Sequence, residues 1–270
     1  MGLPVNTTAK PKRLGVTKTA YVILLMQHCL HNYSEYANST VNWVGTDRPK
    51  TQRLLNDPAF YPTWVQSGWS NNTVIEYKFN SGGFRTDEFD QSKRIIILGS
   101  SPTVGVGLHQ HQTWSEQLSK KINVPIWNLA TGTGSLDTMY RVLKNYISQL
   151  NVIMVIQVGG EKDGFEVYNG NQWQAVSSPH APVSSADIKA TINAWYAHEE
   201  NYNLNQEKNI DAMQWICEKN KVPYHKFSMA EISRENWDKL QPVDWSRCGH
   251  HVGPKFHSVA ADYIAERINR

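Results

Sequence analysis

Cysteine and long hydrophobic runs are both scarce in this sequence. The three cysteines, Cys29, Cys217 and Cys248, are an odd number without C-x-x-C spacing, so we predict neither a disulfide framework nor a structural zinc site. The longest apolar run covers residues 21–26, far short of the roughly 20 residues that span a bilayer. Basic residues precede this run, as in a signal peptide, but no small-residue cleavage site follows it. We therefore expect no export signal, no membrane span and a cytoplasmic location.

An excess of charge of one sign is also missing. The 270 residues include 27 Lys and Arg against 24 Asp and Glu, a formal net charge of +3, with no block of basic residues. Nucleic acids and anionic membranes are bound through clustered positive charge, so neither partner is predicted. Tryptophan and tyrosine are plentiful, at 10 and 12 residues, and packing in the core and at its rim is the favoured explanation.

The pattern of the chain changes after its first quarter. Residues 1–74 contain turn formers and scattered aromatic residues without a strong period. We interpret them as an irregular N-terminal extension that wraps a core, and residues 75–270 as one domain. Residues 74–79 alternate as in a strand, and a Gly-containing turn follows them.

Strands and helices are expected to alternate from residue 93 onward. Short apolar or β-branched runs predict strands at 94–98, 125–128, 152–158 and 222–227. Helical spacing predicts helices at 113–122, 136–150, 185–198, 204–220 and from Pro254. This alternation favours an α/β fold, a three-layer α/β/α sandwich with a mostly parallel, flavodoxin-like sheet. Ligands of such sheets bind beyond the carboxyl ends of the strands.

Three loops at that edge carry the candidate chemistry. After the first strand, Ser101 combines an exposed hydroxyl with a backbone N–H suited to an oxyanion. After the second, residues 131–134 (Thr-Gly-Thr-Gly) offer unhindered backbone N–H groups, and either Ser135 or Asp137 is expected to cap the next helix. Before the last helix, His251 is placed to act as a general base toward a serine. Each loop alone has a plainer explanation, a capped turn or a surface histidine.

Together these segments resemble the SGNH/GDSL hydrolase superfamily, and especially its phage-encoded members. Residues 98–108 (Leu-Gly-Ser-Ser-Pro-Thr-Val-Gly-Val-Gly-Leu), followed by Gln-Thr-Trp at 112–114, are similar to its first block. Residues 128–141 are similar to the second block, and residues 251–257 (His-Val-Gly-Pro-Lys-Phe-His) to the last. Residues 75–85 are similar to a segment that the phage proteins carry upstream. The likeness spans about residues 41–270, and a viral origin would place the protein in the cytoplasm of the host.

The resemblance implies an ester hydrolase that works through an acyl-serine intermediate. Ser101 matches the nucleophile and its amide the first oxyanion donor, while His251 matches the general base. The second oxyanion amide falls on Thr133 or on the neighbouring Gly132. The implied substrate is a small-molecule or carbohydrate ester, with O-acyl groups on a carbohydrate as the narrower expectation. The resemblance implies no metal and no organic cofactor, and it gives no oligomeric state.

Two positions depart from the pattern of the superfamily. Cys248 stands where an aspartate usually precedes the histidine, and a neutral thiol cannot stabilise the imidazolium that forms in the reaction. Asp244 is the candidate to replace that aspartate, a backbone carbonyl is the alternative, and Cys248 as the nucleophile is a third hypothesis. The usual asparagine of the third block is also missing at residues 159–163, where Lys162 is the only candidate donor and Glu161 would repel an oxyanion.

Other functions are less well supported by the sequence. Gly105-x-Gly107 lacks the third glycine of a dinucleotide fingerprint, and there is no phosphate loop. A metal site would need convergence of loop histidines without a recognisable ligand spacing, so surface positions are expected for His109, His111, His250 and His257. The main alternative is a catalytically weak or inactive binding or virion-associated domain that keeps the fold without the chemistry.

Overall fold

The computed structural model describes residues 31, 33–42, 56–160, 164–168, 173–176 and 186–268. Its centre is a four-stranded parallel sheet with the strand order β4-β3-β5-β8. The strands are β3 (Arg94–Gly99), β4 (Ile126–Asn128), β5 (Val152–Val158) and β8 (Tyr224–Phe227). In chain order this is the flavodoxin-like arrangement 2-1-3-4, in which the first strand lies inside the sheet. The predicted fold class is confirmed.

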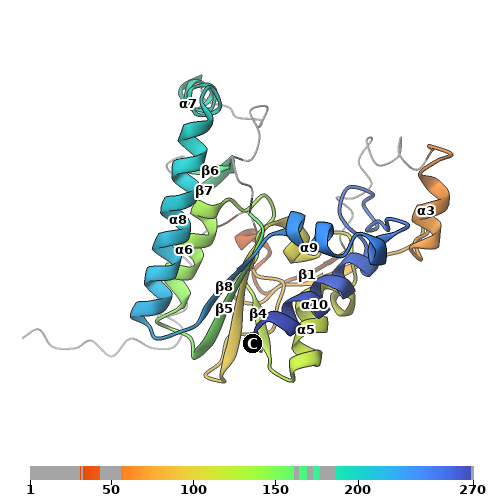
Figure 1. The fold of residues 1–270 in the computed structure, drawn as a ribbon, viewed down its shortest axis with the longest axis horizontal. Helices are drawn as coiled ribbons and strands as arrows, with labels where there is room; N and C mark the ends of the chain where they lie inside the picture. Colours follow the sequence, from red (N-terminus) through yellow and green to blue (C-terminus); the bar gives the residue numbers. More distant parts are fainter. Residues whose placement is uncertain are drawn as a thin grey trace, which may run out of the picture.

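Helices cover both faces of this sheet (Figure 1). On one face lie α6 (Leu136–Tyr146) and α8 (Glu199–Lys219), and on the other lie α5 (Trp114–Ile122), α9 (Met229–Glu235) and α10 (Pro254–Ile268). Strand β3 supplies both cores because successive side chains point to opposite faces. Ile96 and Leu98 pack toward α6 and α8, whereas Ile95 and Ile97 pack toward α5 and α10. This explains why the whole run is apolar rather than alternating.

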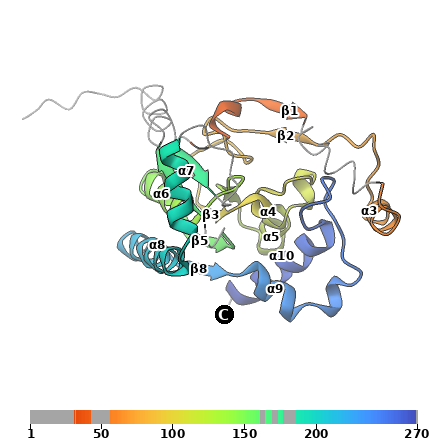
Figure 2. The same ribbon diagram turned by 90° about the horizontal axis from the view of Figure 1, so that it is seen from above.

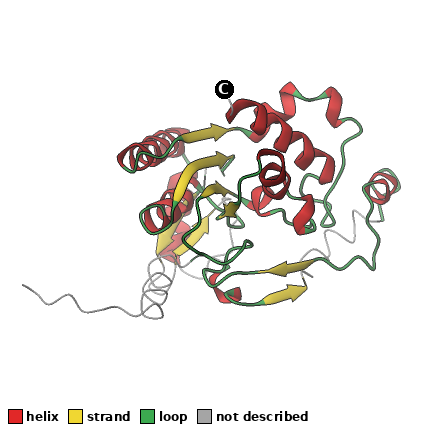
Figure 3. Ribbon diagram, turned by 90° about the horizontal axis from the view of Figure 1, so that it is seen from below, coloured by secondary structure: helices red, strands yellow, loops and turns green. Residues whose placement is uncertain are grey.

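Smaller elements surround the sandwich. The predicted strand at 74–79 is β2 (Glu76–Lys78), and it pairs with β1 (Thr40–Asn42) outside the central sheet, as Figures 2 and 3 show. A hairpin of β6 (Phe165–Tyr168) and β7 (Trp173–Val176) follows β5, and α7 (Ala186–Tyr196) comes after it. Short helical segments are η1 (Ser34–Tyr36), α3 (Tyr61–Gln66), α4 (Ser101–Val104), η2 (Gln110–Gln112) and η3 (Asp238–Leu240).

Helix α8 begins earlier than the sequence pattern indicates. The predicted helix starts at residue 204, but α8 starts at Glu199 after the N-cap residue His198. Glu199 and Glu200 occupy its first turn, where negative charge is favoured by the N-terminal end of the helix dipole. The hydrophobic period begins later than the helix because the first turns of α8 are largely exposed.

The described N-terminal residues pack on the sandwich. Tyr33, Trp64 and Trp69 belong to a third apolar cluster, together with Tyr77 and Val104. The Trp64 indole donates to the Arg247 carbonyl across 3.1 Å, so this segment contacts the loop that precedes the last helix. The division of the chain at residue 74 stays a prediction.

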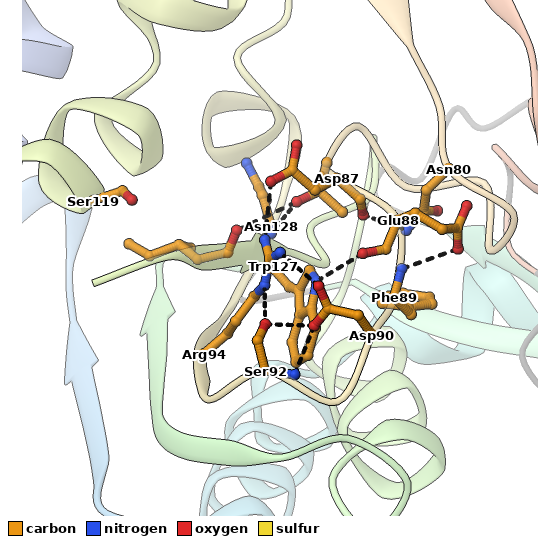
Figure 4. Close-up of polar contacts among 12 residues, drawn as sticks. Asn80, Asp87, Glu88, Phe89, Asp90, Ser92, Arg94, Ser119, Trp127 and Asn128 are labelled. Carbon is orange, nitrogen blue, oxygen red and sulfur yellow. Dashed lines mark hydrogen bonds and ion pairs between the residues drawn. The ribbon is translucent and has the colours of Figure 1, made fainter. Parts of the chain in front are cut away.

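A polar turn covers the edge of the sheet beside β4 (Figure 4). Arg94, the first residue of β3, forms ion pairs of 2.9 Å with Asp87 and 3.0 Å with Asp90. The Thr86 hydroxyl accepts from the backbone N–H of Asn128 at 3.1 Å. The hydrogen bond to Thr86 occupies a backbone N–H of β4, an edge strand that would otherwise expose this group.

No helix in the ranges that the structure describes is both long enough and apolar enough to cross a membrane.

Candidate active site

Ser101 lies at the carboxyl end of β3, where the strand passes directly into helix α4. The turn is tight: a Cβ on Gly99 would lie 2.2 Å from Oγ1 of Thr103, so only glycine fits there. Gly105 ends the helix in the left-handed region, with φ of 76°. The Ser101 side chain is half-buried, and its N–H is among the first amides of a helix, which have no partner within that helix.

His251 meets Ser101 from the loop before α10. Its Nε2 lies 2.8 Å from Ser101 Oγ, although the two residues are 150 positions apart in the chain. On the other side of the ring, Nδ1 lies 3.0 Å from Sγ of Cys248. That thiol in turn lies 3.0 Å from the hydroxyl of Ser246. Four side chains therefore form a continuous row that leads from the half-buried Ser101 into the protein.

Asp244 lies at the start of α10. One carboxylate oxygen accepts from the backbone N–H of Lys255 at 2.5 Å, and the other accepts from Phe256 at 3.4 Å. Burial raises the pKa of this carboxyl, against the lowering effect of the two backbone hydrogen bonds. The sequence analysis proposed Asp244 as the residue that contacts Nδ1 of His251. The side chain that the structure places at Nδ1 is Cys248.

The loop after β4 brings Gly132 and Thr133 to the same edge of the sheet. Thr133 is exposed and adopts φ of 55°, an unusual conformation for a β-branched residue. Ser135 is the N-cap of α6 and accepts from the backbone N–H of Thr138 at 3.3 Å. Of the two predicted caps, the structure thus selects Ser135. The Asp137 carboxylate instead accepts from the Asn209 side chain at 2.7 Å.

The two loops that carry Ser101 and His251 are joined through their backbones. The N–H of Arg247 donates to the carbonyl of Gly107 at 2.8 Å. A Cβ on Gly107 would lie 2.9 Å from the backbone N of Cys248, and the φ of Gly107 is 78°. The close approach therefore requires glycine, and it fixes the loop of the histidine against the loop of the serine.

Arg85 holds the loop that follows Ser101 and α4, a role that the sequence analysis did not predict. Its buried guanidinium donates to the carbonyls of Gly105 at 2.8 Å and Leu108 at 2.7 Å. It lies 3.6 Å from the centre of the Tyr77 ring, and the Tyr77 hydroxyl accepts from Gly107 N–H at 2.7 Å. Burial lowers the pKa of Arg85 and raises that of Tyr77 to about 12. The only signal in the sequence was the resemblance of residues 75–85 to a segment of the phage proteins.

The remaining sequence candidates have other surroundings. Glu161 and Lys162 lie outside the described residues. The rings of His109 and His111 stack at 5.7 Å. The expected surface position is wrong for His257, which is buried and accepts from Trp114 N–H at 2.9 Å. In the described ranges, no three His, Cys, Asp or Glu side chains gather as a metal ion would require.

The arrangement can transfer a proton between an alcohol and an imidazole. A serine hydroxyl at hydrogen-bond distance from a histidine, whose second nitrogen is held by another side chain, is the geometry of an activated oxygen nucleophile. The third position holds a thiol here in place of a carboxylate.

No protein-family model matches this sequence. A search of curated proteins found no match. Among solved structures, the chain is similar to the psychrotrophic esterase EstA from Pseudoalteromonas sp., with 18% identity, 67% of this chain and 97% of that chain covered, and a TM-score of 0.37. It is also similar to the acetyl xylan esterase Est2A from Butyrivibrio proteoclasticus, with 12% identity, 67% and 64% covered, and a TM-score of 0.37. At sequence identities and TM-scores this low, the similarity says nothing about the chemistry of this chain, which has to be inferred from the site.

Proposed function

We propose that this protein is a serine hydrolase that cleaves carboxylic esters through an acyl-Ser101 intermediate. The observation that carries the proposal is the 2.8 Å distance between Ser101 Oγ and His251 Nε2 at the carboxyl edge of a parallel sheet. Parallel α/β sheets bind ligands at this edge. Both side chains are half-buried and therefore within reach of a substrate.

The reaction needs only groups of the chain and water. His251 Nε2 accepts the Ser101 proton as Oγ attacks the ester carbonyl carbon, and the carbonyl oxygen becomes an oxyanion. The N–H of Ser101 and the N–H of Thr133 are the donors we assign to it. The backbone of Gly132, the other residue that the sequence offered, hydrogen-bonds the Tyr33 hydroxyl. The C–O bond then breaks, and the leaving alcohol takes the proton from His251. Water repeats the sequence on the acyl-enzyme, which releases the carboxylic acid and restores Ser101.

Cys248 takes the place of the acid in this mechanism. With the His251 proton on Nδ1, the ring donates toward Sγ of Cys248 and leaves Nε2 free to accept from Ser101. The contact at 3.0 Å orients the ring, and the mechanism requires the tautomer that carries its proton on Nδ1. A thiol supplies less negative potential to the imidazolium than a carboxylate does, so we expect slow turnover. Loss of the aspartate charge in a comparable triad lowers kcat by about 10⁴-fold.

The narrower parts of the proposal concern substrate and setting. We assign an O-acyl group on a carbohydrate as the substrate, in the cytoplasm of the cell or, for a phage protein, of its host. The near balance of charge supports a substrate other than a nucleic acid or a membrane surface.

A second candidate function is a binding or virion-associated domain with little or no turnover. The thiol at the position of the acid favours it.

Turnover of a chromogenic acetate ester by wild type, Ser101→Ala and His251→Gln separates the hydrolase from the binding domain. We expect each variant to lose about a hundredfold or more in kcat/KM. Ser119→Ala, on α5, is the matched control and should keep wild-type turnover. Equal rates for wild type and Ser101→Ala would support the binding domain instead.

A further inference from the structure

An open pocket of about 560 Å³ lies between helix α6 and the β6–β7 hairpin. Its lining comes from α6 and from two residues of the hairpin, and it includes Asp137, Tyr140, Arg141, Lys144, Glu166 and Trp173. Figure 1 shows the hairpin beside the end of α6, on the side of the molecule away from α5 and α10. None of the chemistry assigned to Ser101 and His251 uses these residues.

The floor of the pocket is a buried ion pair. Arg141 contacts both carboxylate oxygens of Glu166, at 2.7 and 2.8 Å. The side chains are 12% and 4% exposed. The Thr138 hydroxyl also donates to Glu166 at 2.8 Å, and the Glu166 N–H donates to Asp137 at 3.1 Å. These contacts fix the floor before any ligand binds, which lowers the entropic cost of binding.

The charges around the pocket cancel. Asp137 and Glu166 are acidic, and Arg141 and Lys144 are basic. Asp137 already accepts two hydrogen bonds, and Glu166 accepts three. A strongly anionic or cationic ligand would therefore find no unbalanced charge of opposite sign. The lining favours a neutral ligand that is rich in hydrogen-bonding groups.

The wall of the pocket is aromatic. Trp173 is 36% exposed, and its ring lies 5.3 Å from the guanidinium carbon of Arg141. The ring of Tyr168 lies 5.5 Å from that of Trp173, and Tyr168 is 57% exposed. Tyr140 adds a phenol on the helix side. An apolar flat surface next to polar groups suits the C–H faces and hydroxyls of a pyranose ring.

Helix α6 links the pocket to the loop at the candidate active site. This helix begins directly after the loop that holds Gly132 and Thr133, and the hairpin follows the carboxyl end of β5. A Cβ on Gly160, at the end of β5, would lie 3.0 Å from Leu136, the first residue of α6. A chain of sugar units in the pocket would therefore extend along α6 from the loop that holds Gly132 and Thr133.

We propose that this pocket binds the glycan part of a neutral oligosaccharide ester, with Trp173 as the stacking surface. Binding of the glycan requires no catalysis and stands without the proposed ester hydrolysis. Only the statement that the bound glycan carries the reacting ester rests on that proposed function. The proposal assigns the pocket a substrate class, neutral pyranose oligosaccharides. It also predicts that the acyl group is carried by a sugar at the α6 end nearest Ser101.

The test measures binding on the Ser101→Ala protein, which cannot form the acyl-enzyme. The probes are unacylated xylotetraose and cellotetraose, with tetragalacturonate as a charged counterpart. Saturation-transfer NMR reports on the C–H protons of the sugar. Indole ¹⁵N spectra report on Trp173, whose resonance is identified by its loss in Trp173→Ala. We expect a neutral tetrasaccharide to shift that resonance with a Kd of about 1 mM, an affinity ordinary for a weak site.

Matched tryptophans provide the controls. Trp173→Ala should weaken binding about tenfold, and Trp173→Phe should recover part of the loss because a flat ring remains. Trp215→Ala, which removes a 59% exposed tryptophan from α8, should bind as its parent does. The proposal is overturned if neither neutral sugar binds, if Trp215→Ala weakens binding as much as Trp173→Ala, or if tetragalacturonate binds as tightly. Sugar binding without ester turnover in the wild type would leave the pocket assigned and refute the hydrolase.

Discussion

The thiol of Cys248 lies 3.0 Å from Nδ1 of His251, and the hydroxyl of Ser101 lies 2.8 Å from Nε2 of the same ring. A thiol thus occupies the position at which an aspartate would complete a serine, histidine and acid triad. The thiol can orient the ring, but it supplies less negative charge to the imidazolium that forms during the reaction.

Replacing Cys248 by aspartate should therefore raise the rate. The new carboxylate would accept from Nδ1–H of His251 and from the Ser246 hydroxyl, and it would stabilise the imidazolium. We expect kcat/KM for an acetate ester to rise by about tenfold or more, and Cys248→Ala to lower it by a similar factor. Steady-state kinetics of the three proteins at one pH check this. An unchanged rate in both variants would show that the thiol does not act on His251.

Asp244 should contribute to stability more than to turnover. Its carboxylate accepts from the first amides of α10, as an N-cap does. We expect Asp244→Ala to lower the free energy of unfolding by about 1 kcal/mol. The kcat/KM should fall far less than in His251→Gln when both proteins are folded. Chemical denaturation and ester kinetics measure the two effects. A loss of activity equal to that of His251→Gln would restore Asp244 as the partner of the histidine.

The sheet could be predicted from the sequence because its signal is local. The run at residues 94–98 is buried on both faces, so its composition alone indicates an interior parallel strand. The hairpin of β6 and β7 was missed because its two four-residue strands, Phe-Glu-Val-Tyr and Trp-Gln-Ala-Val, mix polar and apolar side chains and form no continuous apolar run. Over so short a run, alternation cannot be distinguished from the pattern of a loop.

The site was predictable in part for a related reason. Ser101 and His251 stand next to strand and helix ends that the pattern fixes, so their loops could be placed at one edge of the sheet. Arg85 was not predictable, because its contacts are carbonyls of a loop whose path depends on the tertiary fold. The resemblance put Cys248 at the position of the usual aspartate, and the structure places its thiol at Nδ1 of His251. The residues alone did not decide whether Cys248, Asp244 or a backbone carbonyl would hold the ring.

Arg85 should affect turnover through the position of the Ser101 loop. Methionine at this position would leave the carbonyls of Gly105 and Leu108 without their buried donor, at a cost of about 1–3 kcal/mol each in the worst case. We expect Arg85→Met to lower kcat more than it changes KM, and Arg85→Lys to recover part of kcat. The measurement is ester kinetics below the unfolding transition of each variant.

Arg94→Met is the control for this prediction. Arg94 also carries a largely buried guanidinium, but it lies at the opposite end of β3 from Ser101. Its loss should destabilise the protein and leave kcat close to wild type. If the two variants reduce kcat equally at matched stability, Arg85 has no specific influence on the Ser101 loop.

His257 should make the protein less stable in mild acid. Burial lowers the pKa of its imidazole from 6.5 to about 3, so the folded state stays unprotonated where the unfolded chain binds a proton. Stability contributed by the neutral ring is complete above pH 6.5 and decreases as the pH falls toward about 3. His31 acts in the same direction, because burial lowers its pKa to about 4.

The contribution of His257 can be isolated with asparagine, whose side-chain oxygen can replace Nδ1 as the acceptor for Trp114 N–H. Between pH 6 and pH 4 the free energy of unfolding of wild type should fall more steeply than that of His257→Asn, by about 1.4 kcal/mol per pH unit. Urea denaturation at several pH values gives both slopes. Parallel slopes for wild type and His257→Asn would mean that the buried ring takes up its proton without unfolding.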